Sequence, residues 1–255
     1  MPDLSGKAAI VTGCASGIGA ATLRRLREDG AKVLGTDIDE ATGNKICQKT
    51  GASFAVQDVS DRAGWEEIVA KAVSTFGRLD ILVNNAGIVS GASIGDVDDE
   101  TWDRVIAVNL TGTMAGCRAA ISAMKDNPGG AKGSIINISS TTAMAPLPTD
   151  VGYSASKGGV RVLSKSVATW CAQQGYAIRC NTVIPGATET GILNAAEEAT
   201  PGLKAAVAAT SPMNRLADPA ETAAAIAFLA SDECPFMTGA ELLVDGGALS
   251  IHPGF

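Results

Sequence analysis

Histidine, aromatic residues and paired cysteines are scarce in this sequence of 255 residues. His252 is the only histidine, and aromatic residues make up 4% of the chain. Mechanisms that need a histidine base, such as Ser-His-Asp hydrolysis, and metal sites built from several histidines are therefore not expected. The six cysteines contain no Cys-x-x-Cys pair, which argues against a cysteine-bound metal and a disulfide framework. We expect a protein with free thiols and no metal site.

A basic excess and long apolar runs are missing as well. The chain carries 27 acidic and 20 basic side chains, a net charge of −7, whereas nucleic-acid-binding proteins usually present a clustered basic face. No uninterrupted apolar run approaches the ~20 residues of a membrane-spanning helix. The residues from Met1 to Lys7 show no secretory leader. We expect no nucleic-acid partner, no membrane partner and a cytoplasmic location.

What is present is a globular composition, 46% hydrophobic and 18% charged. Short runs rich in Val and Ile alternate with longer segments of helical spacing. Strands are predicted at Lys7–Thr12, Lys32–Thr36, Ser53–Gln57, Ile81–Asn84, Ser134–Ser139, Ile178–Ile184 and Leu242–Val244. Helices are predicted at Gly17–Asp29, Glu40–Lys49, Arg62–Phe76, Asp99–Lys125, Gly152–Gln174 and Asp218–Ala230. This alternation is typical of an α/β fold with a parallel sheet, and because no linker divides the chain we expect one domain over residues 1–255.

One segment, Thr190–Asn214, departs from this alternation. It contains small, helix-tolerant residues flanked by glycine and proline, between the sixth predicted strand and the last long helix. Such a long connection in a compact domain is typical of a lid or a binding element, and an ordinary exposed excursion is the alternative. We predict a substrate lid near residues 190–214.

A glycine-rich turn follows the first predicted strand and opens the first helix. Gly13, Gly17 and Gly19 permit positive φ angles and a close approach of the backbone to a ligand. Ser16 and Ile18 lie between them, where the unpaired N–H groups of the helix start favour a pyrophosphate. The spacing G-x-x-x-G-x-G in a strand–turn–helix context therefore predicts that these five residues bind a dinucleotide.

An acidic residue, Asp37, ends the second predicted strand, eighteen residues after Gly19. A carboxylate at this place can accept hydrogen bonds from the ribose hydroxyls of an adenosine, and it repels a 2′-phosphate. The neighbouring turn residues Cys14, Ala15 and Ser16 supply no positive charge. The sequence therefore predicts NAD as the cofactor rather than NADP.

A tyrosine and a lysine, Tyr153 and Lys157, are four residues apart on one face of a predicted helix. A nearby positive charge lowers the pKa of a tyrosine, which is otherwise about 10, and makes the phenol a better base. Ser140 lies thirteen residues before Tyr153, just past a predicted strand, where its hydroxyl could hold a substrate oxygen. Ser139 is the competing candidate, and it could equally be structural.

These features, in this order, resemble those of the short-chain dehydrogenases/reductases of about 250 residues. The resemblance covers essentially the whole chain. Its motifs are Thr12-Gly-x-x-x-Gly-Ile-Gly19, Asp58-Val59, Asn84-Asn85-Ala86-Gly87, Asn109, Ser140, Tyr153-x-x-x-Lys157 and Pro185-Gly186-x-x-x-Thr190. The resemblance implies a single Rossmann-type, doubly wound parallel sheet of about seven strands with helices on both faces.

The resemblance also implies a role for each catalytic candidate. Tyr153 would be the general acid/base, and Lys157 would lower its pKa and bind the nicotinamide ribose. Ser140, preferred to Ser139 because of its spacing from Tyr153, would position the substrate oxygen. Asn109 would hold a water that links Lys157 to solvent.

Further residues are implied to bind the cofactor. Asp58 and Val59 would contact the adenine, and the next strand end would line the adenosine side. The segment from Pro185 would grip the nicotinamide carboxamide. Besides Tyr153 and Lys157, the implied cofactor residues after the glycine turn are Asp37, Asp58, Val59, Asn85, Ala86, Gly87, Pro185, Gly186, Thr188 and Thr190.

The function expected from these observations is NAD-dependent interconversion of a secondary alcohol and a ketone, with a small, neutral, apolar or cyclic substrate. Two alternatives stay open. The chain could be a 3-oxoacyl thioester reductase, which Asp37 disfavours because those enzymes usually take NADPH. It could also be a non-catalytic NAD(H)-binding sensor, although such proteins typically lose the tyrosine or the lysine. The resemblance further implies a homotetramer.

Overall fold

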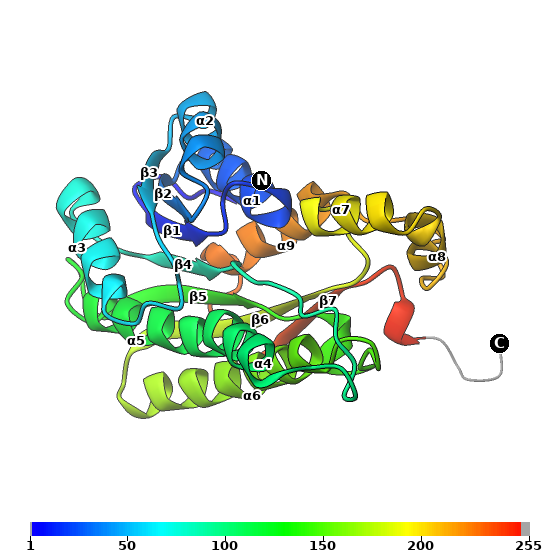
Figure 1. The fold of residues 1–255 in the computed structure, drawn as a ribbon. Coiled ribbons are helices and arrows are strands. Elements are labelled where there is room, and N and C mark those ends of the chain that lie inside the picture. Colours follow the sequence, from blue (N-terminus) through cyan, green and yellow to red (C-terminus); the bar gives the residue numbers. More distant parts are fainter. Residues whose placement is uncertain (1, 251–255) are drawn as a thin grey trace.

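A parallel seven-stranded sheet forms the centre of the described part of the chain, residues 2–250, in this computed structural model (Figure 1). The strands are β1 (Ala8–Thr12), β2 (Lys32–Asp37), β3 (Ser53–Val56), β4 (Ile81–Asn84), β5 (Lys132–Ile138), β6 (Ala177–Pro185) and β7 (Glu241–Val244). Their order is β3-β2-β1-β4-β5-β6-β7, and every neighbouring pair is parallel. Residues 1 and 251–255, with them His252, lie outside the description, as do the side chains of Ile192, Ala195, Ala196 and Ala199.

Helices cover both faces of this sheet, which confirms the predicted Rossmann-type α/β fold. The helices are α1 (Gly17–Glu28), α2 (Glu40–Thr50), α3 (Gly64–Phe76), α4 (Asp99–Ile106), α5 (Gly112–Met124), α6 (Val151–Gln173), α7 (Gly191–Ala199), α8 (Leu203–Ala208) and α9 (Pro219–Ala230). Figure 1 shows α1, α2 and α9 on one side of the sheet and α3, α5 and α6 on the other. The order reverses between β1 and β4, which makes this the point where ligands bind in doubly wound folds.

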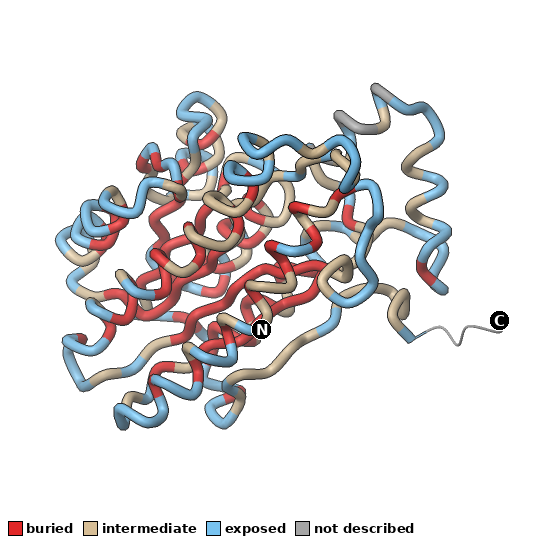
Figure 2. Tube along the Cα trace, turned by 60° about the horizontal axis from the view of Figure 1, so that its bottom comes forward, coloured by how far each residue is buried: buried red, intermediate tan, exposed pale blue. Residues whose placement is uncertain are grey.

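The hydrophobic core has two layers, one on each face of the sheet. Successive side chains of a strand point to opposite faces, so Leu82 packs with Trp65 on one side, while Ile81 and Val83 pack with Leu23 on the other. Figure 2 shows the buried residues along the central strands and the exposed ones on the outer surfaces of the helices. Because both faces are covered, the strands read in the sequence as nearly continuous apolar runs.

The helix predicted at Asp99–Lys125 is interrupted. Between α4 and α5, the residues Ala107–Thr111 form a π-helical segment, η1. Together the three elements make the helix Asp99–Met124, which is long and apolar enough to cross a membrane by length and composition alone. Here it lies on the sheet: α5 contacts β4, β5 and α3, and its Ala120 and Met124 are fully buried. It is thus a core helix.

The predicted lid segment contains the two helices α7 and α8, which Figure 1 shows at one end of the sheet. Its two ends lie side by side. Thr188 forms a β-bridge with Ala217, and the amide of Ala217 donates a hydrogen bond of 2.8 Å to the carbonyl of Ala187. The excursion therefore leaves the end of β6 and returns to it before α9 begins.

Candidate active site

The glycine-rich turn lies between β1 and α1, as predicted. Gly13 and Gly17 have φ angles of 67° and 50°, which side-chain-bearing residues rarely adopt. A Cβ atom on Gly19 would stand 1.9 Å from the carbonyl oxygen of Gly13, so only glycine allows the helix to start this close to the strand. Ser16 precedes the helix as its N-cap, and its side chain makes no capping hydrogen bond. The turn thus presents bare backbone and free N–H groups, which fits the pyrophosphate of a dinucleotide.

Asp37, at the end of β2, lies beside this turn. One carboxylate oxygen accepts a hydrogen bond of 2.9 Å from the amide of Ala15, and the other accepts one of 3.0 Å from the amide of Asp39. The carboxylate is only half-buried, so part of it faces outward at the edge of the turn. This position fits an acceptor for ribose hydroxyls.

Asn85 supports the turn from the end of β4. Its side-chain amide donates to the carbonyls of Thr12 (2.9 Å) and Gly13 (3.2 Å). The Thr12 hydroxyl oxygen in turn accepts from the amides of Asn85 and Ala86, both at 3.0 Å. We expected Asn85 to line the adenosine side, and the structure shows in addition that its side chain holds the glycine turn in place.

The residues that follow β3 and β6 lie at the same edge of the parallel sheet as the glycine turn. Asp58 is exposed, whereas Val59 is buried and its carbonyl accepts a hydrogen bond of 3.0 Å from the indole of Trp65. A Cβ on Gly186 would lie 2.8 Å from the Cα of Asp245, so this glycine is needed where β6 passes β7.

Thr188 and Thr190 follow the end of β6. The Thr188 hydroxyl donates to the carbonyl of Gly186 at 3.1 Å. Thr190 faces the glycine turn, since a Cβ on Gly17 would stand 3.1 Å from its methyl carbon. The segment after β6, expected to bind the nicotinamide, therefore lies next to the glycine turn, expected to bind the pyrophosphate.

Tyr153 and Lys157 lie on one face of α6, with the Lys157 Nζ atom 5.6 Å from the centroid of the Tyr153 ring. Lys157 is 4% exposed, and its amine donates a hydrogen bond of 2.9 Å to the carbonyl of Ile138. A Cβ on Gly87 would stand 3.2 Å from this amine, so the glycine leaves room for it. The end of β5 and the loop after β4 thus fix the lysine from both sides.

Burial controls the pKa values of this pair. It lowers the pKa of Lys157 to about 8, because the charged ammonium loses hydration. It also raises the pKa of Tyr153, with a smaller upward contribution from the charge of Asp150, while a side-chain hydrogen bond with Ser140 acts to lower it. We expected Lys157 to lower the pKa of Tyr153. The net direction is upward, because the desolvation of the phenol outweighs its neighbours, and the lowering of the pKa by Lys157 stays a prediction.

The two candidate serines have different surroundings. Ser139 is 2% exposed, and its hydroxyl donates to the backbone carbonyl of Lys157 at 2.8 Å, which is a structural contact. Ser140 lies next to the tyrosine, with which it forms the side-chain hydrogen bond named above, and its hydroxyl oxygen also accepts one of 3.2 Å from the amide of Thr142. The geometry therefore favours Ser140 as the residue that can bind a substrate oxygen.

Asn109 is fully buried in the π-helical segment η1. Its amide nitrogen donates to the carbonyl of Ile88 (2.8 Å) and to the hydroxyl of Ser156 (3.0 Å). The Ser156 hydroxyl donates to the backbone carbonyl of Tyr153 at 2.7 Å. Asn109 is thus linked through its side chain to the turn of α6 that carries the tyrosine.

The chain is similar to known proteins along nearly its whole length. The profile of the family described as "Enoyl-(Acyl carrier protein) reductase" matches residues 13–248. The chain is 40% identical over 248 residues to the NADP-dependent (R)-specific alcohol dehydrogenase of Lentilactobacillus kefiri, covering 96% of this chain and 97% of the relative. The protein belongs to the short-chain dehydrogenases/reductases. It is therefore an oxidoreductase of a family that uses nicotinamide cofactors and acts on small molecules.

Two other relatives of this short-chain dehydrogenase/reductase are similarly close. It is 41% identical over 259 residues to 3beta-hydroxysteroid dehydrogenase 1 of Eggerthella lenta, covering 99% of this chain and 97% of the relative. It is 39% identical over 252 residues to trans-4-hydroxycyclohexanecarboxylate dehydrogenase of Sinomonas cyclohexanicum, covering 94% of this chain and 92% of the relative.

One residue near the candidate active site, Asp150, was not predicted from the sequence. Asp150 is the N-cap of α6, and its carboxylate accepts a hydrogen bond of 3.2 Å from the amide of Tyr153. An aspartate three residues before a tyrosine at the start of a helix is a recognisable capping signal. Nothing in the spacing indicated that this aspartate would be buried.

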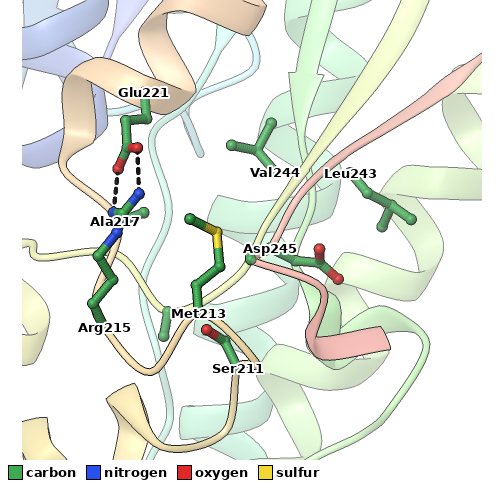
Figure 3. Close-up of a pocket in the computed structure, with 10 residues that line it drawn as sticks. Ser211, Met213, Arg215, Ala217, Glu221, Leu243, Val244 and Asp245 are labelled. Atoms are coloured by element: carbon green, nitrogen blue, oxygen red, sulfur yellow. Dashed lines mark hydrogen bonds and ion pairs between the residues drawn. The ribbon is translucent and has the colours of Figure 1, made fainter. Parts of the chain in front are cut away.

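A cavity of about 230 Å³ lies between the segment after α8 and the end of β7 (Figure 3). Met213 reaches into it beside the ion pair of Arg215 and Glu221, with Asp245 on the other side. Met213 belongs to the predicted lid segment, but this cavity is not lined by Ser140, Tyr153 or Lys157.

The six cysteines are free and buried. Over residues 2–250, no group of three or more His, Cys, Asp or Glu side chains is placed to hold a metal ion.

Proposed function

We propose that this protein catalyses the NAD-dependent interconversion of a secondary alcohol and a ketone. The observation that carries the proposal is the convergence of Ser140, Tyr153 and Lys157 at the carboxyl ends of β5 and β4, next to the bare glycine turn. A proton donor or acceptor, a second hydroxyl and a buried amine thus lie beside a site that fits a dinucleotide.

Each residue has a chemical task in this proposal. The Tyr153 hydroxyl exchanges a proton with the substrate oxygen, and the Ser140 hydroxyl holds that oxygen and stabilises the charge that develops on it. The Lys157 amine binds the cofactor ribose and assists proton transfer. The glycine turn would hold the pyrophosphate of the cofactor and the segment from Pro185 its nicotinamide, which would supply or accept the hydride.

Asp37 supports NAD over NADP. Its carboxylate lies at the edge of the turn, held by the amide of Ala15, where a 2′-phosphate would meet a like charge. The turn between Gly13 and Gly19 contains no lysine or arginine. The Lentilactobacillus kefiri relative is NADP-dependent by name, so this residue, and not that relative, carries the NAD proposal.

Exposed apolar side chains support a neutral, apolar substrate. They lie on the loop after β4, the loop after β5 and the predicted lid. These residues are Val89, Ile94, Met144, Leu147 and Met213. The named substrates of two relatives, a hydroxysteroid and a hydroxylated cyclohexane acid, contain rings, which favours a cyclic alcohol or ketone here. In this proposal, the segment 190–214 closes over the substrate.

We also propose that the chain is one domain that forms a homotetramer in the cytoplasm. Large exposed apolar residues on α6 and around β7, among them Trp170, Phe236 and Leu243, support contact with further copies.

The test is a steady-state assay of the purified protein with NAD and with NADP on linear, cyclic, aryl and steroid secondary alcohols, and with NADH and NADPH on a 3-oxoacyl thioester. We expect turnover of a cyclic or aryl alcohol, with kcat/KM higher for NAD. Activity restricted to a 3-oxoacyl thioester and NADPH would replace this proposal by the thioester reductase. Tight NADH binding without turnover of any compound would indicate the sensor.

A further inference from the structure

Asp150 differs from the other aspartates that begin helices in this protein. Asp39, Asp98 and Asp218 cap α2, α4 and α9, and each is exposed and accepts a hydrogen bond from its own helix. Asp150 caps α6 in the same way, but it is 6% exposed. Among the described residues, no lysine or arginine forms an ion pair with it.

The buried carboxylate instead binds a second segment, the loop after β4. It accepts hydrogen bonds from the amides of Ser90 (3.2 Å) and Gly91 (3.1 Å) and from the Ser90 hydroxyl. Next to it, the amide of Val151 donates to the carbonyl of Ala92 at 3.2 Å. An uncompensated carboxylate is costly to bury, and these N–H and O–H donors together with the positive end of α6 are what stabilise it.

This loop is therefore held at two points. Asn109 binds both backbone groups of Ile88, where the loop leaves β4, and Asp150 binds Ser90 and Gly91 two and three residues later. The loop carries Val89, one of the exposed apolar residues near the site. One of the two side chains that hold the loop relative to Tyr153 is therefore Asp150, which the proposed chemistry does not use.

We infer that Asp150 is a positioning residue that holds the loop of residues 88–92 against the start of α6, and so sets the place and the electrostatic surroundings of Tyr153. The part of this inference that concerns catalysis rests on the proposed function. The hydrogen bonds themselves do not depend on that function.

The charge of Asp150 has a second consequence. The charged groups around Tyr153 are Asp150, before the helix, and Lys157, one turn into it; Ser140, from the end of β5, and Ser90, from the loop, are neutral. The negative charge of Asp150 raises the pKa of the phenol. A neutral residue in its place leaves the tyrosine easier to deprotonate.

Four variants separate the charge from the contact. Asp150→Asn keeps the shape and one acceptor oxygen and removes the charge. Asp150→Ser keeps a capping hydroxyl, but its side chain is too short to reach the loop. Ser90→Ala removes the hydroxyl donor on the loop side. Asp98→Asn, at an exposed N-cap, is the matched control.

We measure kcat/KM for alcohol oxidation as a function of pH. In Asp150→Asn, we expect the acidic limb of this pH profile to move to lower pH by about half a pH unit or more. Ser90→Ala and Asp150→Ser should raise KM for the alcohol by about 5-fold to 10-fold, since the loop is released, and Ser90→Ala should leave the limb where it is. Asp98→Asn should change neither. An unmoved limb in Asp150→Asn, or an unchanged KM in Asp150→Ser, would overturn the inference.

Two readouts do not need turnover and keep this inference distinguishable from the proposed function. The chain has 2 tyrosines, so the ultraviolet absorbance of the phenolate, with Tyr153→Phe as the blank, reports the titration of Tyr153 directly. Hydrogen exchange of the Ser90 and Gly91 amides reports the hold on the loop. A lower Tyr153 pKa in Asp150→Asn and faster exchange in Asp150→Ser support the inference even in a protein that oxidises none of the alcohols, and the opposite result refutes it.

Discussion

The side-chain amide of Asn109 binds both backbone groups of Ile88: its oxygen accepts from the Ile88 amide at 2.8 Å, and its nitrogen donates to the Ile88 carbonyl at 2.8 Å. One side chain thereby joins the π-helical segment η1 to the loop after β4. Since the same nitrogen also binds Ser156, the contact reaches the turn of α6 that carries Tyr153.

Asn109→Ala should therefore lower both stability and activity. It leaves the amide and carbonyl of the half-buried Ile88 without their partners, which predicts a loss of about 2–4 kcal/mol in the free energy of unfolding. Denaturant titration measures this loss. Asn44→Ala, on α2, is the control and should stay within about 0.5 kcal/mol of the wild type; an equal loss in both variants would contradict the role given to Asn109.

Gly19→Ala should abolish dinucleotide binding. The new Cβ would stand 1.9 Å from the Gly13 carbonyl oxygen, and because that atom belongs to the backbone, the whole turn must move. We expect the free energy of unfolding to fall by about 1–3 kcal/mol, and we expect no saturable NADH binding in a fluorescence titration. Gly158→Ala, where the Cβ meets nothing within 4 Å, should instead gain up to about 1 kcal/mol as a helix residue.

Tyr153→Phe should remove the chemistry and keep the fold. Loss of the general acid/base predicts a decrease in kcat/KM of at least about 100-fold. NADH affinity should change by less than about 3-fold, because the glycine turn and Asp37 are untouched. The control is Tyr176→Phe, at the residue that packs edge-on against Trp170 with ring centroids 6.0 Å apart. Its turnover should match that of the wild type, and full activity of Tyr153→Phe would exclude the mechanism.

Lys157→Met should raise stability at neutral pH while it destroys activity. Burial lowers the pKa of Lys157 from 10.5 to about 8, so the unfolded chain binds this proton more tightly than the folded protein. The wild type consequently gains stability as the pH rises from about 8 to about 10.5, up to about 3 kcal/mol from this group.

Methionine lacks this titration, so the advantage of Lys157→Met is largest below pH 8 and shrinks above it. Loss of the hydrogen bond to the Ile138 carbonyl offsets about 1 kcal/mol of the gain. Thermal unfolding of both proteins between pH 7 and about 10 checks the trend. A stability difference that grows with pH would contradict the buried, weakly basic lysine.

Asp37→Asn should weaken the proposed preference for NAD. The amide keeps an oxygen that can accept from Ala15 but loses the charge that repels a 2′-phosphate, so the ratio of kcat/KM for NADP over NAD should rise about 10-fold. Asp232→Asn serves as the control, because Asp232 pairs with Lys7 and Lys132 at the amino ends of β1 and β5, the opposite edge of the sheet. An unchanged ratio in Asp37→Asn would place the selectivity elsewhere.

Much of this arrangement was determined by the sequence alone. Apolar runs and helical spacing depend on residues close in the chain, so the strands, their parallel pairing and most helices were predictable. The glycine turn and the pair Tyr153 and Lys157 are local as well: one needs three glycines around a helix start, the other a spacing of one helical turn. The predicted α/β fold and the family follow from these local patterns.

The tertiary structure alone decided how these pieces are held. The π-helical turn around Asn109, the hold of Asn85 on the glycine turn and the burial of Asp150 against Ser90 all join segments far apart in the chain, the last pair by 60 residues. It also decided the direction of the Tyr153 pKa, because desolvation depends on everything packed around the phenol. Sequence spacing determines which residues share a strand or a helix face; burial and contacts across the sheet arise only when those faces pack together.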